Sequence, residues 1–377
     1  MDFRLDNEQE LLRDGLARFL SARYDLAASR ATARTGAGWQ PDIWRSFADE
    51  LGILGATLPA DVGGSDGGAV ELMVIAEELG RALVIEPYVG TVVVSGGLLR
   101  RAGGETAHAL LERIAAGDAV VALAATEAGS VDELAPVSTA TRDGDEWVLD
   151  GAKTVVLDAP LADHLIISAR TDEGLSLFVC EFDAAASPPG VSVHGYRTID
   201  DRRAADLSFD GLRLPGTALL GEAGCAESNL ARALDEGATA VASEAVGCMR
   251  NVLADTVEYA KTRQQFGAPI GSFQALQHRM TDMYMELQQS VAAVCLAVLN
   301  LDAEPTARAR AVSAAKVTVG RAARLIGQEA VQLHGAMGMT EELAIGDYFK
   351  RLTAVQYEFG STDRHRTRYA ALTRPGR

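Results

Sequence analysis

The sequence has little positive charge, no paired-cysteine spacing and no long apolar run. Its 377 residues include 35 Lys and Arg against 52 Asp and Glu, a formal net charge of −17. Such a polyanion is not expected to bind nucleic acid or an anionic membrane surface. Because no run of about 18 apolar residues occurs, we expect no membrane-spanning helix.

The cysteines are few and scattered. None of the four forms a C-x-x-C pair (Cys180, Cys225, Cys248, Cys295). This spacing excludes a disulfide framework and a zinc ribbon, and it is typical of buried thiols in a reducing compartment. The charged amino terminus, Met1–Asp6, lacks the apolar segment of a secretory signal. We therefore expect a cytoplasmic protein.

Hydrophobic periodicity divides the chain into three predicted domains, because 377 residues exceed one small core. Residues 1–118 have the apolar spacing of helices. Residues 119–225 contain short apolar runs separated by Gly and Asp, which predicts an antiparallel β-barrel or sandwich. Residues 226–377 return to long helical patterns rich in small side chains, which predicts a four-helix bundle.

Individual elements can be placed within these domains. Helical spacing covers Glu8–Tyr24 and Val70–Leu83, and Pro305 begins a long alanine-rich helix. A strand, a turn at Asp143–Asp145 and a second strand follow one another in the middle domain. The glycine-rich run Gly63–Gly68 is predicted to be a turn, because it lacks the Gly-Lys-Ser/Thr ending of a phosphate loop.

The last domain contains two runs with the chemistry of dinucleotide binding. The first is Arg263–Gly267 (Arg-Gln-Gln-Phe-Gly) with Gln274 shortly after it, and the second is Gln332–Thr340. A guanidinium can pair with pyrophosphate oxygens through two parallel hydrogen bonds. Amide side chains and glycine backbone complete such a site without a Rossmann loop.

These runs, in this order, resemble the flavin-binding motifs of the acyl-CoA dehydrogenase family. Further similar runs are Glu77–Arg81, Thr126–Glu127 and Asp150–Lys153, so the resemblance covers nearly the whole chain. The Leu51–Ala56 run especially resembles the small-subunit branch of heteromeric members. The resemblance implies a helical domain, a β-domain and a helical bundle.

The resemblance also implies FAD and the α,β-dehydrogenation of an acyl-CoA thioester. A carboxylate base removes the α-proton, FAD supplies the redox chemistry, and an electron-transferring flavoprotein accepts the electrons. In the family, these motifs hold the ADP half of an FAD whose flavin ring lies in a neighbouring subunit. The matching residues are Arg263, Gln265, Phe266, Gln274, Gln332 and Gly335.

The flavin half departs from the family pattern. The family has an aromatic residue and a hydroxyl residue after its Gly-x-Lys, where this chain has Val155 and Leu157. Neither side chain can stack on a flavin or donate a hydrogen bond to it. The loop Ala128–Asp132 also differs from the usual Pro-Gly-x-Gly-Ser-Asp.

The catalytic base is ambiguous. One family position falls on Gly237, and the neighbouring Glu236 is rotated away by about 100° on a helix. The other position, near the carboxyl end, falls on Glu358 or on Phe359, depending on which flanking motif sets the register. The family's CoA-anchoring arginine is replaced by Ala238.

Three functions fit this pattern. The first is a catalytically degenerate, ADP-binding subunit that completes the site of a second acyl-CoA dehydrogenase-like chain in an α2β2 heterotetramer with two FAD. The second is a self-sufficient homotetrameric dehydrogenase that uses Glu358 as its base. The third is a structural partner subunit without cofactor contact. The acyl group stays open among fatty, dicarboxylic, aromatic and steroid side-chain thioesters.

Overall fold

The computed structural model describes residues 4–35, 37–130 and 132–374. The predictions that rest on Met1–Phe3 and on Val131 lie outside these residues. The chain forms two compact units, one of Met1–Leu26, Ala69–Val84 and Ala238–Arg377, the other of Ala27–Gly68 and Ile85–Gly237. No helix in the described ranges is long and apolar enough to cross a membrane.

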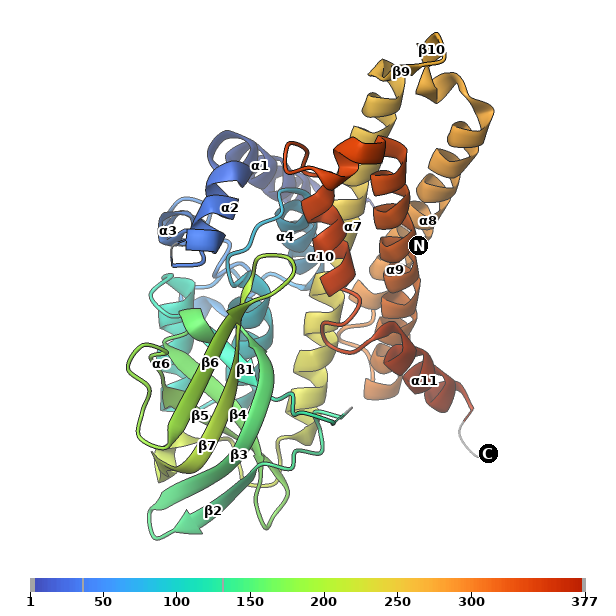
Figure 1. The fold of residues 1–377 in the computed structure, drawn as a ribbon. Helices are drawn as coiled ribbons and strands as arrows, with labels where there is room; N and C mark the ends of the chain where they lie inside the picture. The colour runs from blue at the N-terminus through green and yellow to red at the C-terminus, as the bar shows by residue number, and fades with distance from the viewer. Residues whose placement is uncertain (1–3, 36, 131, 375–377) are drawn as a thin grey trace. The chain divides into compact units, whose positions relative to one another are not determined.

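The second unit is built on one sheet of eight strands (Figure 1). The strands are β1 (Val121–Ala124), β2 (Thr139–Asp143), β3 (Glu146–Leu157), β4 (His164–Arg170), β5 (Leu175–Glu181), β6 (Val191–Arg197), β7 (Arg203–Pro215) and β8 (Leu219–Leu220). Their order is β6-β7-β3-β2-β4-β5-β8, with β1 beside β4. The predicted strand, turn and strand at Asp143–Asp145 are the β2–β3 hairpin.

Most neighbouring strands are antiparallel, as predicted, but β2 pairs with β4 in parallel at Thr139 and Arg170, and β1 pairs with β4 in parallel. The β2–β3 hairpin lies between them in the sequence, and this long connection permits the parallel pairing. The outer edge of β1 is covered at Val121, whose N–H donates to Thr91 Oγ1 at 3.2 Å and whose carbonyl accepts from Ser95 Oγ at 3.1 Å. Both hydroxyls belong to η2 (Val89–Ser95), a π-helix whose wide turn presents them together.

The remaining elements of this unit are short. They are α2 (Leu26–Thr35), α3 (Pro41–Asp49), η1 (Ala60–Val62), α5 (Gly96–Ala102), α6 (Glu105–Ala115), η3 (Ala159–Leu161) and η4 (Gly216–Ala218). The glycine-rich run connects η1 to α4, as expected; its first residue, Gly63, forms a turn that ends η1 with a left-handed φ of 83°, and residues 64–68 continue as a loop.

The first unit contains the long helices. They are α1 (Asn7–Arg23), α4 (Ala69–Arg81), most of α7 (Glu227–Thr262), α8 (Gln274–Val298), α9 (Pro305–His334), α10 (Ile345–Ala354) and α11 (Thr362–Thr373). Short elements join them: β9 (Gln264–Gln265), β10 (Ala268–Pro269), η5 (Ile270–Ser272) and η6 (Gly335–Met339). The helical, β and helical order predicted from the sequence is confirmed.

Two glycines allow α4 and α7 to cross closely. A Cβ built on Gly247 would lie 1.8 Å from the Glu77 carbonyl oxygen, and one built on Gly80 would lie 2.0 Å from the Glu244 oxygen. Cys248 Sγ donates to the Gly80 carbonyl at 3.0 Å across the same crossing. The glycine of the Glu77–Arg81 run therefore allows this backbone contact.

Candidate functional site

The Arg263–Gly267 run forms a projecting hairpin where α7 leads into α8 (Figure 1). Gln265 pairs with Ala268, which leaves Phe266 and Gly267 as a two-residue turn. Both have positive φ, 54° and 79°, as a type I′ turn requires. A bulky residue such as phenylalanine is strained there, and strain of this kind often marks a binding site.

The hairpin presents an aromatic ring and unpartnered polar side chains to solvent. Phe266 is 93% exposed and contacts Phe273 edge-on, with ring centroids 6.2 Å apart. Within the described part of the chain, the side chains of Arg263, Gln265 and Gln274 make no hydrogen bond or ion pair. The polar side chains of the hairpin are therefore free to contact a ligand or another chain.

The end of α9 lies beside the end of α7. The His334 ring stacks on Tyr259 with a centroid distance of 4.3 Å, and Tyr259 Oη donates to the His334 carbonyl at 3.3 Å. Tyr259 lies one helical turn before Arg263, and His334 follows Gln332 closely. This contact therefore joins the two motifs predicted to bind FAD.

The turn after α9 has the backbone freedom that the sequence suggested. Gly335 has φ 60° and ψ −136°, a conformation that only glycine adopts readily. Gln332 is exposed, and its amide has no partner among the residues described. The ends of α7 and α9, which the Tyr259–His334 contact brings together, thus offer a guanidinium, amide side chains, an aromatic ring and a glycine backbone. These groups have the chemistry that the ADP half of FAD would need.

The flavin-half motif forms a bulge in β3. The pairing of β3 with β7 shifts register between Lys153 and Val156, and Val155 in the bulge has a φ of 50°. A β-branched residue in this region is strained. The bulge is held by Asp206, whose Oδ1 accepts from Val155 N at 2.9 Å and from Tyr196 Oη at 3.0 Å.

The bulge presents no aromatic ring or hydroxyl where the family pattern would have them. The Val155 side chain is 52% exposed, whereas Leu157 is half-buried. Neither can donate a hydrogen bond. The bulge in β3 therefore carries apolar aliphatic side chains, those of Val155 and Leu157, at these two positions.

A buried ion pair supports this bulge from the inside. Lys153, which is fully buried, donates from Nζ to Glu127 Oε1 at 2.7 Å and to Ser168 Oγ at 3.0 Å. Glu127 also accepts from Ser138 Oγ at 2.6 Å and from Val137 N at 2.6 Å. Burial opposes ionisation of Glu127, but these hydrogen bonds outweigh it and lower its pKa to about 2. The Thr126–Glu127 and Asp150–Lys153 motifs thus form one structural network.

The helix position for the base carries no carboxylate. Gly237 is buried in α7. The adjacent Glu236 accepts from Arg101 Nη1 at 2.8 and 2.9 Å and from Arg232 Nε at 3.0 Å. Its oxygens are held in an ion-pair cluster on another side of the helix.

The second candidate, Glu358, is held by an arginine. Arg351 Nη2 donates to Glu358 Oε2 at 3.0 Å, and Arg351 Nη1 donates to Oε1. The other edge of the buried guanidinium binds Glu244, at 2.8 Å from Nε and 2.9 Å from Nη2. Both oxygens of Glu358 are engaged in this Glu244–Arg351–Glu358 cluster.

The backbone around Glu358 is also fixed. Lys316 Nζ donates at 2.7 Å to the carbonyls of Val355 and Glu358, and His365 Nε2 lies 2.9 Å from the Phe359 carbonyl. Burial lowers the pKa of Lys316 to about 7, although Glu358 opposes this shift. Phe359 itself has a strained φ of 52°.

Sequence reasoning missed Arg351, Lys316 and His365, which fix this segment. A signal existed for Lys316, because it lies at helical spacing between Val312 and Val319 on the apolar face of α9. A lysine on such a face needs buried partners. Arg351 gave no comparable signal.

Comparison with known proteins identifies the class. Family models for the N-terminal, middle and C-terminal domains of acyl-CoA dehydrogenases match residues 6–118, 122–212 and 228–372. The chain belongs to the acyl-CoA dehydrogenase family. It is thus a member of an FAD-dependent family of oxidoreductases that act on CH–CH donors.

Individual relatives cover almost the whole chain. The acyl-CoA dehydrogenase IpdE2 of Mycobacterium tuberculosis is 31% identical over 345 residues, which are 91% of this chain and 90% of that protein. A solved variant of the Tcur3481-Tcur3483 steroid ACAD has a TM-score of 0.88, 29% identity and 97% coverage of both chains. The ChsE4-ChsE5 complex from Mycobacterium tuberculosis shares the fold, with a TM-score of 0.90, 24% identity and 100% coverage of both chains.

Proposed function

We propose that this chain is the ADP-binding subunit of a hetero-oligomeric acyl-CoA dehydrogenase. Its partner is a second acyl-CoA dehydrogenase-like chain, which supplies the flavin contacts, the catalytic base and the acyl pocket. In an assembly with two-fold symmetry, each interface site takes groups from both chains. The proposal predicts an α2β2 complex with two FAD, not four.

The observation that carries this proposal is the difference between the two halves of the site. On the ADP side, Arg263 and Phe266 are exposed, and the Arg263 side chain makes no polar contact with the rest of the described chain. On the flavin side, the family's aromatic and hydroxyl positions hold Val155 and Leu157. A chain with only the first half can complete a neighbour's site but not its own.

The positions of the base candidates support the same conclusion. Gly237 has no side chain, and the Glu358 carboxylate is bound by Arg351 through both oxygens. Freeing Glu358 would break its two charge-assisted hydrogen bonds to the buried Arg351 guanidinium, at a cost of about 1.5–3 kcal/mol for each bond. These contacts favour a structural role for Glu358 over the role of base in a self-sufficient enzyme.

The residues proposed to hold FAD all lie at the joined ends of α7, α8 and α9. Arg263 would pair with the pyrophosphate, the amides of Gln265, Gln274 and Gln332 would complete the polar contacts, and Phe266 would pack against the adenosine portion. Gly335 would allow the backbone to approach. FAD held by these residues would supply the redox chemistry of the dehydrogenation, and an electron-transferring flavoprotein is the electron acceptor that the family implies.

A named relative supports assembly with a different chain. The Tcur3481-Tcur3483 steroid ACAD carries two chain names. The proposal transfers to the present chain only the assembly of two different subunits. It leaves the acyl group of the substrate open.

Expression with and without a partner tests the proposal. The chain alone is expected to purify without stoichiometric FAD and to oxidise no acyl-CoA in a panel of butyryl-, octanoyl- and steroid side-chain thioesters. Co-expression with a dehydrogenase-like chain that has the aromatic-x-Thr run and a base glutamate should give one FAD per pair of chains. One FAD per chain and turnover by the isolated protein would overturn the proposal.

A matched pair of variants in the complex separates cofactor binding from a purely structural role. Arg263→Ala should release FAD from the complex, whereas Arg310→Ala, at an exposed position of α9, should not. Unchanged FAD content in Arg263→Ala would favour a structural subunit without cofactor contact. Size-exclusion chromatography with light scattering confirms that both variants still assemble.

A further inference from the structure

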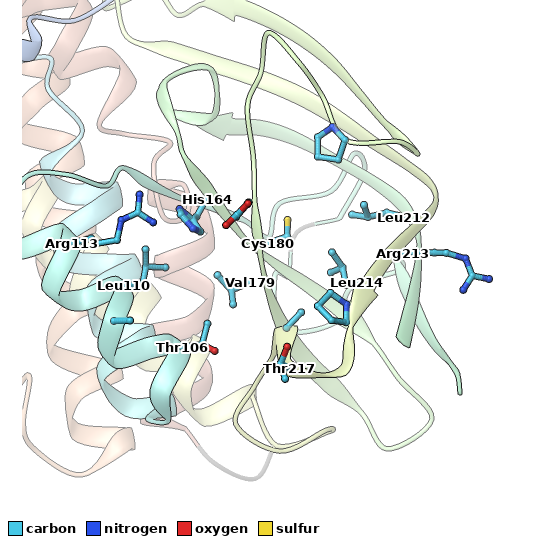
Figure 2. A pocket seen from close by; sticks show the side chains of 15 residues that line it. Thr106, Leu110, Arg113, His164, Val179, Cys180, Leu212, Arg213, Leu214 and Thr217 are labelled. Carbon is cyan, nitrogen blue, oxygen red and sulfur yellow. The ribbon is translucent and has the colours of Figure 1, made fainter. Parts of the chain in front are cut away.

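The second unit contains a pocket between α6 and one end of the sheet (Figure 2). Its volume is about 600 Å³. This lies within the range of about 300–1,000 Å³ that is typical of small-molecule sites. The pocket is independent of the proposed function, because it uses none of the residues assigned to FAD.

The wall of the pocket is mainly apolar. The side chains of Leu110, Val179, Leu212 and Leu214 are buried and line it from α6, β5 and β7. Figure 2 shows Leu110 and Val179 on one side and Leu212 and Leu214 on the other. Ala109 lies at the exposed rim on α6. Such a wall can accommodate the apolar part of a ligand.

Polar groups meet at one end of the pocket. His164, the first residue of β4, pairs with Glu181, the last residue of β5, and Figure 2 shows Arg113 beside His164. The Nδ1 atom of His164 is buried and has no hydrogen-bond partner among the described residues. The Arg113 guanidinium makes one long hydrogen bond within the described chain, from Nη2 to the Asp118 carbonyl at 3.3 Å. This end therefore has unused hydrogen-bonding capacity.

The charges at this end sum to one negative charge. Arg113 is positive, Glu181 is negative, and Asp163 adds a second carboxylate near His164. Burial, together with Arg113, lowers the pKa of His164, so its ring is neutral near pH 7. Arg213 also lines the pocket, but its guanidinium binds Asp143 and Glu146, each at 2.7 Å. A neutral polar group, which can accept from Arg113 and exchange a hydrogen bond with His164, fits this end better than an anion.

The pocket is separate from the flavin-side network. His164 begins β4, whereas Ser168, which binds Lys153, lies four residues along the same strand, or about 13 Å away. The nearby Cys180 thiol is not a nucleophile, because burial raises its pKa to about 12. The pocket therefore has the properties of a binding site and not of a second reaction centre.

We propose that this pocket binds a small neutral amphipathic molecule, with its apolar body between α6 and β7 and a hydroxyl or carbonyl end at Arg113 and His164. The buried, unpartnered Nδ1 atom and the apolar wall point to this chemistry together. A bound group at Arg113 and His164 would satisfy polar atoms that the described chain leaves open.

Binding of 1-octanol and of octanoate to the purified chain tests this inference. Isothermal titration and saturation-transfer NMR should show saturable binding of one 1-octanol per chain. Octanoate should bind at least about threefold more weakly, because Glu181 and Asp163 oppose its charge. Glu181→Gln should reduce that difference.

Variants with matched controls locate the site. Ala109→Trp places an indole at the rim and should abolish 1-octanol binding, whereas Ala116→Trp, at an exposed position just past α6, should not. Arg113→Met should weaken binding about tenfold through the loss of one charge-assisted hydrogen bond, and Arg100→Met should leave it unchanged. Thermal unfolding verifies that each variant is folded. The inference would be overturned if the chain showed no saturable 1-octanol binding, or if Ala109→Trp and Arg113→Met bound 1-octanol as tightly as the unsubstituted chain does.

Discussion

Replacing Phe266 with alanine should weaken FAD binding by the complex without destabilising the isolated chain. The ring is 93% exposed, and its only aromatic contact among the described residues is the edge-on pair with Phe273. The loss of that pair accounts for at most about 1.5 kcal/mol of folding free energy. Alanine also keeps the strained φ of 54°, so the backbone term is unchanged.

The expected effect on binding follows from the area that a ligand can cover. A phenylalanine side chain buries about 150–250 Å² when fully covered. At about 25 cal/mol per Å², and with part of the area retained by alanine and by neighbouring groups, the loss is about 2–3 kcal/mol. The dissociation constant for FAD should therefore rise roughly 30- to 150-fold.

Titration of the apo-complex with FAD, followed by flavin fluorescence, measures this change. Leu11→Ala is the matched control, because Leu11 is an exposed apolar residue on α1 outside the proposed site. A change of less than about threefold for Phe266→Ala, with the complex intact, would refute the assignment of the hairpin to cofactor binding.

Three further predictions follow from buried groups and close contacts. Glu358→Gln should leave the turnover of the complex with its best acyl-CoA substrate unchanged. In denaturant melts it should lower the free energy of unfolding by about 2–4 kcal/mol, because it breaks the ion pair with Arg351. A large loss of turnover at full FAD content would instead identify Glu358 as the base. The folded pKa of Glu127 is about 2, below its unfolded value of 4.5, so its contribution of at most about 3 kcal/mol to stability is present above pH 4.5 and is lost as the pH falls toward 2. In urea melts from pH 4.5 to pH 2, the free energy of unfolding should therefore change less with pH in Glu127→Gln than in the unsubstituted chain. An equal pH dependence of the two proteins would contradict the network. Gly247→Ala should destabilise the chain by more than about 2 kcal/mol, because the new Cβ would meet the Glu77 carbonyl. Gly15→Ala on α1 is the control: a Cβ there has nothing within 4 Å and should stabilise the chain by about 0.5–1 kcal/mol. Similar melting temperatures for the two variants would contradict the close crossing.

Features set by local sequence could be predicted well. The helical stripes and the alternation around Asp143–Asp145 depend on neighbouring residues, and they predicted the helical, β and helical order that the structure has. The Arg263–Gly267 run lies in one hairpin, so its chemistry could be recognised before its geometry was known. Its FAD-binding role and the three domain boundaries stay predictions.

Features that join distant segments could not be predicted in the same way. The parallel pairing of β1 with β4 depends on the path of the whole β2–β3 hairpin. The Glu244–Arg351–Glu358 cluster takes one group each from α7, α10 and the segment after α10. No periodic pattern encodes such a meeting, so the sequence left the base position open between Glu358 and Phe359, while the structure shows that the Glu358 carboxylate is bound by Arg351.

The bulge at Val155 is a property of the backbone and of the residues beneath it. It is held by Asp206 and by the pair formed by Lys153 and Glu127, none of which involves the side chain at position 155. The contour of β3 should therefore be kept when the side chain at position 155 is replaced, even by an aromatic one. The strain at Val155, about 1–3 kcal/mol, is offset by these contacts and needs no bound group to maintain it.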